Sequence, residues 1–353
     1  MAGSLAFALP PGTGTSFSRA AVVPAPALGP RPSAGGVGQG GGGRWGFPLS
    51  LALAAVHVRA AHGRGRAEAA RRRATGREQQ VLPFVDSASG REVVLIASVH
   101  FNPRSVEKAA AVTRRLARQE ELAAVVLESC PSRWAKVEEL QQPGSLWRLL
   151  LDNEMQAAED EAKAVGRAVV LGDQRIEDLS TDIKAAGQEA LEDLGSFPEG
   201  WFRTFAEIWD GALTLLGRKA KAKGGSDALG LWDFADPALV FGFLVAVPRY
   251  LLSTALKAPA LLLAVLAFFT LYALLPANLL GDVLVFLIEA VMLRVILSVL
   301  LRDRDLILAR SIRQTAASAR DPGTVVAVLG AAHCNGVKRH LESASMEESE
   351  SAL

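Results

Sequence analysis

The chain of 353 residues is poor in the features that mark several classes of protein. It has two cysteines, Cys130 and Cys334, which cannot form the disulfide framework of a small secreted domain and which indicate a reducing compartment or chance retention. Neither sign of charge is in excess, since 38 Lys and Arg residues balance 37 Asp and Glu residues. The resulting net charge of +1 gives no indication of nucleic acid as a partner.

Acidic residues are absent from the first 67 positions, which carry six arginines and are rich in Ala, Ser, Gly and Pro. This composition predicts that residues 1–75 are an organelle transit peptide or, as the alternative, a disordered tail. The Ser- and Pro-rich start favours the chloroplast over the mitochondrion. A secretory signal is not predicted, because Met1–Pro11 has no basic start.

From residue 81 the chain alternates short apolar runs with segments of helical spacing. This alternation predicts an α/β domain with a largely parallel central sheet and flanking helices. The domain comes in two parts, residues 81–235 and 302–342, followed by an acidic tail, 343–353, that is expected to be disordered. The expected strands are 81–85, 92–96, 122–127, 167–171 and 325–329, and the expected helices include 105–121, 138–151, 153–165 and 302–319.

A long apolar block, residues 237–301, separates the two parts of the domain. The 24 residues between Lys257 and Asp282 carry no charge, and roughly 20 such residues suffice to cross a bilayer. The block therefore predicts a C-terminal transmembrane helical hairpin with spans at 259–280 and 283–301. A buried core helix is the alternative interpretation of the first span.

The basic residues next to these spans predict how the hairpin is oriented. Lys257, Arg302 and Arg304 flank its outer ends, and positive flanks stay on the side of synthesis, here the stroma or matrix. An even number of crossings also keeps both parts of the α/β domain on one side. The remaining apolar segment, 238–256, is expected to lie on the membrane surface or to pack against the domain.

Chemically capable side chains follow four of the predicted strands: His100, Glu128, Asp173 and His333. Ligands of open parallel sheets bind at the carboxyl ends of the strands, so these side chains are expected to share one pocket. Two imidazoles and a carboxylate are a suitable ligand set for a divalent metal, which turns water into a nucleophile near neutral pH. The alternative is that each histidine is a hydrogen-bonded structural residue.

Six segments carry a resemblance to a known superfamily: ASVHFNPRS at 97–105, LESCPSR at 127–133, NEMQAA at 153–158, LGDQR at 171–175, DRDLILARSI at 303–312 and VAVLGAAHCNGV at 326–337. In this order they resemble the motifs of the TraB/PrgY/TIKI superfamily. Its members include metal-dependent peptidases, membrane proteins that shut down a bacterial peptide pheromone, and organelle membrane proteins of plants and algae.

The resemblance implies a membrane-anchored protein with a metal-dependent, peptidase-like hydrolase site, a divalent metal ion, and a peptide or protein substrate. A non-enzymatic membrane regulator or organelle tether that keeps the fold is the alternative, and a soluble hydrolase with a buried helical insert is a third. A chloroplast membrane is the expected location, with a mitochondrial membrane as the alternative. The main domain is expected on the stromal or matrix side.

The resemblance also implies roles for particular residues. His100 and His333 would be metal ligands, Glu128 would be a ligand or the general base, and Arg133 would orient Glu128 or hold a substrate carboxylate. Residues expected to surround these groups are Ser105, Asp173, Arg175 and Arg304.

One position departs from the superfamily pattern. The second Gly-x-x-His motif is intact at Gly330–His333, but the first has alanine, Ala97, where glycine is usual. Alanine does not easily adopt a positive φ, so a turn that requires one would be altered here.

Overall fold

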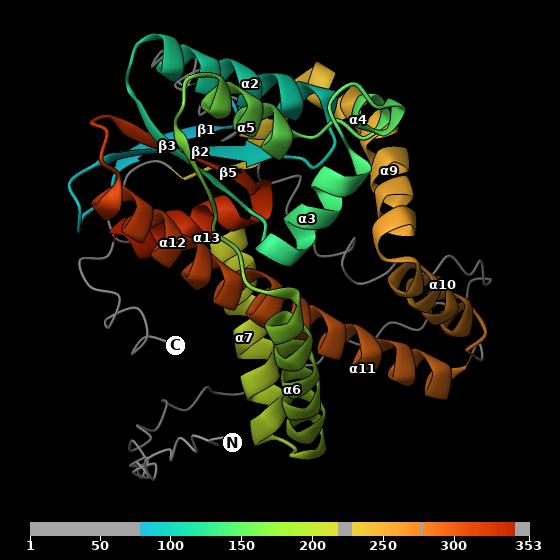
Figure 1. Ribbon diagram of the computed structural model, residues 1–353. Coiled ribbons are helices and arrows are strands. Elements are labelled where there is room, and N and C mark those ends of the chain that lie inside the picture. Colours follow the sequence, from blue (N-terminus) through green and yellow to red (C-terminus); the bar gives the residue numbers. More distant parts are fainter. Residues whose placement is uncertain (1–77, 218–227, 276–277, 343–353) are drawn as a thin grey trace, which may run out of the picture. The chain divides into compact units, whose positions relative to one another are not determined.

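The computed structural model describes residues 78–217, 228–275 and 278–342 (Figure 1). The predicted transit peptide, 1–75, and the predicted acidic tail, 343–353, lie outside the described residues.

The described residues form a five-stranded sheet of order β1-β2-β5-β3-β4. Strand β1 pairs with β2 in the antiparallel sense, and the other pairs are parallel. The predicted α/β fold with a largely parallel sheet is therefore confirmed. The strands are β1 (Val81–Val85), β2 (Glu92–Ser98), β3 (Leu122–Leu127), β4 (Ala168–Leu171) and β5 (Thr324–Gly330).

Strand β5 is the last of these in the chain but lies in the middle of the sheet, between β2 and β3. All seven of its residues are buried, as are all six of β3. Strands covered on both faces have no polar face, which explains the continuous apolar runs TVVAVLG and LAAVVL.

Two helical layers cover the sheet (Figure 1). Helices α2 (Pro103–Arg118) and α5 (Glu154–Ala164) pack with α3 (Pro131–Leu140) on one face, where they bury Val112, Trp134 and Ala158. Helices α12 (Arg304–Ser318) and α13 (Ala331–Glu342) cover the other face, where they bury Leu308, Ile312 and Val337.

The helix predicted at 138–151 is divided in the structure. Helix α3 ends at Leu140, and the short helix α4 (Leu146–Leu150) begins after Ser145, whose side chain accepts from Arg148 N. Pro143 and Gly144 lie between them, and Gly144 has a φ of 79°. Proline and a glycine in the left-handed region together end a helix.

Helices α6 (Ile176–Gly195) and α7 (Glu199–Leu215) form a hairpin beyond the sheet, and a 3₁₀ turn, η1 (Leu231–Phe234), precedes the apolar block. That block contains α9 (Pro237–Lys257), α10 (Pro259–Ala273) and α11 (Leu279–Val295). Helix α11 continues through a π-helical segment, η2 (Ile296–Asp303), directly into α12.

The apolar helices differ in extent from the predicted spans. Helix α10 has 15 residues and ends at Ala273, whereas the prediction extended to residue 280. Helix α11 starts at Leu279, and the side chain of its N-cap residue, Asn278, accepts from Gly281 N. By length and composition, two described helices are able to cross a membrane: Pro237–Lys257 and the continuous helix Leu279–Ser318.

The central position of α12 leads to a stability prediction. Ile312 is fully buried under the sheet, so we expect Ile312→Ala to lower the free energy of unfolding by about 2–5 kcal/mol through lost contacts and a cavity. The matched substitution Ile183→Ala, on the exposed surface of α6, should change it by less than about 0.5 kcal/mol. Equal effects in urea unfolding would contradict the placement of α12 in the core.

Candidate functional site

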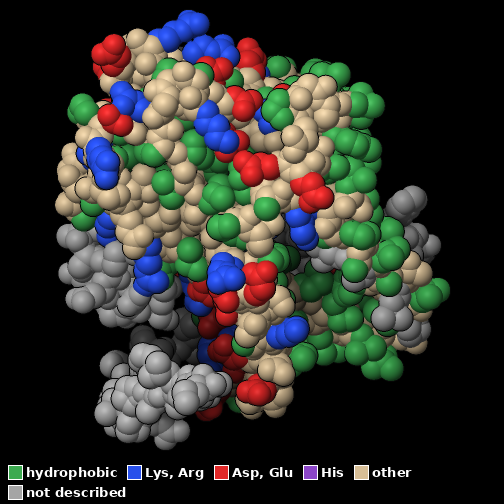
Figure 2. Space-filling model, in the orientation of Figure 1, with side chains coloured by type: hydrophobic (Ala, Val, Ile, Leu, Met, Phe, Trp, Pro, Cys, Tyr) green, Lys and Arg blue, Asp and Glu red, His purple; other side chains and the backbone are tan. Residues whose placement is uncertain are grey.

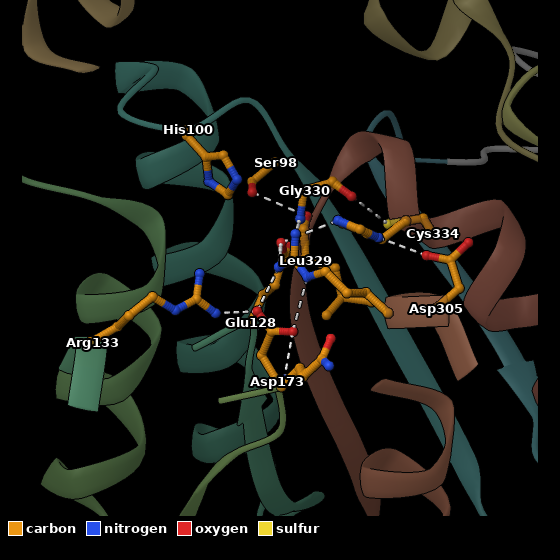
Figure 3. A network of polar contacts seen from close by, with 12 residues as sticks. Ser98, His100, Glu128, Arg133, Asp173, Asp305, Leu329, Gly330 and Cys334 are labelled. Atoms are coloured by element: carbon orange, nitrogen blue, oxygen red, sulfur yellow. Dashed lines mark hydrogen bonds and ion pairs between the residues drawn. The ribbon is translucent and has the colours of Figure 1, made fainter. Parts of the chain in front are cut away.

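The carboxyl ends of the parallel strands bring the predicted side chains to one edge of the sheet (Figure 3). His100 lies just beyond β2, Glu128 directly follows β3, and Asp173 lies just beyond β4. Gly330 is the last residue of β5, between these strands. The prediction that these strand ends share one site agrees with this geometry.

His333 lies in the first turn of α13, because β5 runs into that helix without a loop. Its Nε2 atom is 3.2 Å from Glu128 Oε1, and its Nδ1 atom is 2.6 Å from Asp305 Oδ1. Asp305 fits there because Gly336 has no side chain, since a Cβ at that position would lie 1.7 Å from Asp305 Oδ2. The two ring nitrogens of His333 therefore contact one carboxylate from α12 and one that follows β3.

His100 has an equivalent carboxylate partner. Its Nδ1 atom is 2.6 Å from Oε1 of Glu154, which is buried at the start of α5. The hydroxyl of Ser98 and the amide of Phe101 donate to the same carboxylate, at 3.2 and 3.1 Å. Phe101 has a φ of 60°, a costly conformation for a bulky residue, which turns its N–H toward Glu154.

Glu128 joins the groups at the centre of the site. Its Oε2 accepts from Gly330 N at 2.5 Å, and its Oε1 accepts from Arg304 Nη2 at 2.8 Å. Arg304 also donates to Asp173, which forms an ion pair with Arg133 as well. The carboxylates of β3 and β4 are therefore neutralised by guanidinium groups from α12 and α3.

Gly330 keeps a small space open between the two sides of the site. A Cβ built on this residue would lie 3.2 Å from His100 Nε2 and 3.2 Å from Glu128 Oε2. Both atoms therefore border the same space. His333 Nε2 reaches Glu128 from the other side, so two imidazole nitrogens and one carboxylate converge here.

The charges in this cluster shift its pKa values strongly. Burial lowers the pKa of both imidazoles, but the neighbouring carboxylates outweigh it and raise the pKa of His100 to about 9 and that of His333 to about 10. Burial raises the pKa of Glu128, but His333, His100 and Arg304 hold it well below its usual range. Burial raises the pKa of Asp305 to about 6, against the opposing effect of His333.

Other predicted residues lie at the margin of the site or away from it. Arg133 pairs with Asp173, and it is Arg304 that contacts Glu128. Ser105 is buried in α2, where its hydroxyl accepts from Val99 N and so supports the loop before His100. The side chain of Arg175 is exposed, and its ion-pair partner is Glu177, at 3.9 Å. The structure therefore gives Arg175 no contact with the cluster among the described residues.

The alanine of the first motif causes no backbone strain. Ala97 is a fully buried residue inside β2, paired with Leu329, and is not among the described residues with a positive φ. The position is part of an extended strand and not of a turn that requires a positive φ, so alanine has no such effect here. The left-handed residue of this segment is Phe101, which follows His100.

Sequence reasoning did not assign the two carboxylates that orient the histidines, Glu154 and Asp305. Both lie in segments that carried the resemblance, but neither follows a strand, and each is brought to its histidine by helix packing. A histidine whose second ring nitrogen contacts a carboxylate is the usual arrangement around a protein-bound metal. That arrangement becomes visible only in three dimensions.

The donor set fits a divalent metal in its chemistry. Each histidine has Nδ1 fixed by a buried carboxylate, so Nε2 is the ring nitrogen that would bind a metal ion. Glu128 is anionic. As positioned, residues 78–217, 228–275 and 278–342 contain no group of three or more His, Cys, Asp or Glu side chains arranged to hold a metal ion. His100 would have to approach Glu128 and His333 for all three to act as ligands.

Comparison of the chain with protein-family models gives no match, and comparison with curated proteins gives none either. The membership in the TraB/PrgY/TIKI superfamily that the motifs suggest stays a prediction.

The raised histidine pKa values predict how stability depends on pH in chelator-treated protein. A group whose pKa is raised by folding stabilises the folded state fully below its ordinary pKa, about 6.5, and loses this contribution as the pH rises through its folded value. For His100 and His333 those values are about 9 and about 10. We therefore expect the free energy of unfolding to fall by about 1 kcal/mol or more between pH 7 and pH 10.

The variant His333→Gln should show a smaller fall over the same range, measured by urea unfolding at both pH values. Identical pH dependence in the wild type and in this variant would show that His333 is not held as an imidazolium.

Proposed function

We propose that the chain is a membrane-anchored protein of the TraB type with a metal-dependent, peptidase-like hydrolase site. His100, His333 and Glu128 would hold the metal ion. One observation carries the proposal: both histidines have Nδ1 fixed by a buried carboxylate, and both Nε2 atoms lie beside Glu128 or Gly330. Two unrelated structural histidines have no reason to share this pattern in one place.

A divalent metal at this position would supply Lewis-acid activation of a water molecule or a scissile carbonyl. When each imidazolium loses a proton on metal binding, Glu154 and Asp305 keep the remaining proton on Nδ1, so that the lone pair of each Nε2 faces the metal. Glu128 is ionised at neutral pH because three cationic groups surround it, and it is able to accept a proton or a hydrogen bond from water. Arg304 holds that carboxylate in place.

Arg133 is the best placed group to bind substrate. Its side chain is partly exposed at the margin of the site, and its ion pair with Asp173 uses one terminal nitrogen. Within the described part of the chain its buried Nε–H has no acceptor. Because that Nε–H is buried, the terminal nitrogens of the partly exposed guanidinium are the donors that would reach a substrate carboxylate, which supports a peptide substrate held through an acidic group.

The apolar block 237–301 supports the membrane part of the proposal, since two described helices that begin in it meet the length and composition of a membrane helix. The acid-free N-terminal region supports a chloroplast membrane, with a mitochondrial membrane as the alternative. The α/β domain would then lie on the stromal or matrix side, together with its basic flanking residues.

A non-enzymatic regulator or tether that retains the fold is the second candidate. It is favoured by the engagement of Glu128, whose two oxygens already accept from Gly330 N and Arg304 in the described structure. A carboxylate with these partners is able to serve as a purely structural link between β3, β5 and α12.

Metal content separates the two candidates. We expect detergent-solubilised full-length protein, purified under metal-replete conditions, to contain one divalent metal ion per chain by elemental analysis. The variants His100→Ala and His333→Ala should lose it, and Gly330→Ala should lose most of it, because the added methyl group fills the space between His100 and Glu128.

His62→Ala, which removes a histidine outside the described residues, serves as the matched control and should retain the metal. Circular dichroism and urea unfolding establish that each variant is folded. A folded wild type without metal would overturn the hydrolase proposal and favour the regulator.

The pH dependence of metal affinity gives a second test. Because both imidazoles are protonated at neutral pH in the metal-free site, binding must release two protons. We expect the association constant to rise by about 100-fold per pH unit between pH 7 and pH 8.5, and fewer protons to be released in Glu154→Gln or Asp305→Asn. Calorimetric titration in buffers of different ionisation enthalpy measures the proton count. A pH-independent affinity would show that the metal binds elsewhere.

A further inference from the structure

Helix α9 is fixed to the α/β domain at its N-terminal half. Asn102, in the loop that carries His100, donates to the carbonyl of Leu239 at 2.9 Å. Gly242 makes room for this contact, because a Cβ there would lie 2.4 Å from Asn102 Oδ1. Asp236, at the helix cap, accepts from Arg104 of α2 at 3.0 Å.

The C-terminal half of α9 contacts the same loop. The ring of Tyr250 meets that of Phe101 edge-on, with 6.2 Å between the centroids, and Lys257 Nζ lies 5.8 Å from the centre of the Phe101 ring. Helix α9 also packs against α2, whose six Lys, Arg and Glu residues include Arg104 and Glu107. If α9 crossed a bilayer, it would carry these charges into hydrocarbon, which is costly.

Helix α11 is held outside hydrocarbon in the same way from Phe286 onward. Arg294 is buried and pairs with Asp193, Glu207 and Glu189 of α6 and α7, at 2.6, 2.8 and 3.1 Å. Phe286 packs against aromatic rings of α7. Because α6 carries six acidic residues, the α6–α7 hairpin is unsuited to the interior of a membrane. The part of α11 that packs against this hairpin must therefore also lie outside the membrane interior.

Helix α10 is too short to cross the bilayer alone. Its 15 residues extend over about 22 Å, against about 30 Å of hydrocarbon. It packs mainly against α9, and the hydroxyl of Tyr272 donates to Glu289 of α11 at 2.9 Å. Its exposed side chains are apolar on several sides, among them Leu263, Leu266 and Phe269.

We propose that α10, the outer face of α9 and the exposed leucines at the start of α11, Leu279 and Leu280, are embedded in one leaflet of a bilayer, which the chain enters and leaves on the same side. This monotopic anchor replaces the membrane-crossing hairpin that the sequence predicts. Figure 2 shows hydrophobic side chains gathered along the edge where α9 and α10 lie. Its exposed members include Phe241, Leu244, Leu263, Leu266, Phe269 and Leu279.

The chemistry of this surface fits lipid better than a protein partner. A helix that docks on another protein keeps a polar face toward water, whereas the sequence of α10, PALLLAVLAFFTLYA, has only Thr270 and Tyr272 as polar residues. Arg249 and Lys257 of α9 are partly exposed, and long side chains of this kind are able to reach anionic headgroups from an apolar surface. Single-leaflet burial also accommodates a charge-free segment whose helix, α10, has only 15 residues.

The anchor places the candidate site at the membrane surface. Phe101, next to His100, contacts α9, and a helix with its side chains is about 10–12 Å across. If the proposed hydrolase function holds, the reachable substrate is a peptide segment that lies at the same surface. The anchor itself depends on neither metal nor hydrolysis.

Depth-dependent fluorescence tests the anchor in full-length protein reconstituted into vesicles of equimolar phosphatidylcholine and phosphatidylglycerol. Bimane attached to Leu266→Cys or Leu244→Cys should be quenched by lipids that carry a doxyl group near the headgroup, and bimane on Val85→Cys of β1 should not. Wild type is the labelling blank, because Cys130 and Cys334 are both buried. An unquenched probe on Leu244→Cys would overturn the role of α9.

The side of the membrane on which the α10–α11 connection lies distinguishes burial in one leaflet from a hairpin that crosses the bilayer. Leu279 is 80 % exposed, so Leu279→Cys reports its surroundings. A membrane-impermeant maleimide trapped inside the vesicles should not modify it. Modification from the lumen would overturn the monotopic arrangement in favour of the crossing hairpin.

Flotation of the vesicles measures affinity. We expect Leu266→Asp to weaken vesicle binding by about tenfold or more, and the matched exposed leucine of α6, Leu191→Asp, to leave it unchanged. Failure of wild type to float, with dimers seen by light scattering, would assign the surface to a second copy of the chain and overturn the proposal. His333→Ala should float like wild type, so failure of the anchor and failure of the metal site are distinguishable.

Discussion

The structure around the site depends on one buried carboxylate. Glu128 has to be satisfied because an ionised carboxylate without partners is very costly in a protein interior. Its partners come from three elements that are distant in sequence: the amide of Gly330 at the end of β5, the guanidinium of Arg304 in α12, and the imidazole of His333 in α13. The same carboxylate therefore fixes where the strands end, where the two C-terminal helices sit, and how far His333 is allowed to move.

The two glycines of the C-terminal segment make this arrangement possible for steric reasons. Gly330 leaves space between His100 and Glu128, and Gly336 leaves space for Asp305 beside His333. Neither has a positive φ in the described structure, so close approach, and not backbone conformation, explains why glycine is required. This differs from the usual expectation for glycine in a turn. The arrangement of the site thus depends on positions without a side chain as well as on the polar side chains themselves.

Much of the sheet and of the site could be predicted from the sequence, because both follow from strand patterns. The strands at 81–85 and 122–127 have the expected bounds, and the strand-end rule brought His100, Glu128 and Asp173 together. Contacts between helices were not predictable in this way, since the 3.6-residue period tells which face is apolar but not which helix it meets. Glu154, Asp305 and the ion pairs of Arg294 all belong to this second class. The packing of the apolar block belongs to the same class, because hydropathy does not show that α9 packs on α2 or that α11 packs on a charged hairpin.

The central position of β5 also determines when the domain is able to fold. Strands β2 and β3 are synthesised early but do not pair with each other, and each waits for a partner that is more than 190 residues later in the chain. Until β5 arrives, two apolar strands have open edges, which are sites for misassociation during biosynthesis. Contacts of such high sequence separation slow folding. The two halves of the sheet, β1-β2 and β3-β4, are therefore joined only once β5 has been made, and a chain that ended before β5 would have neither the complete sheet nor the polar cluster.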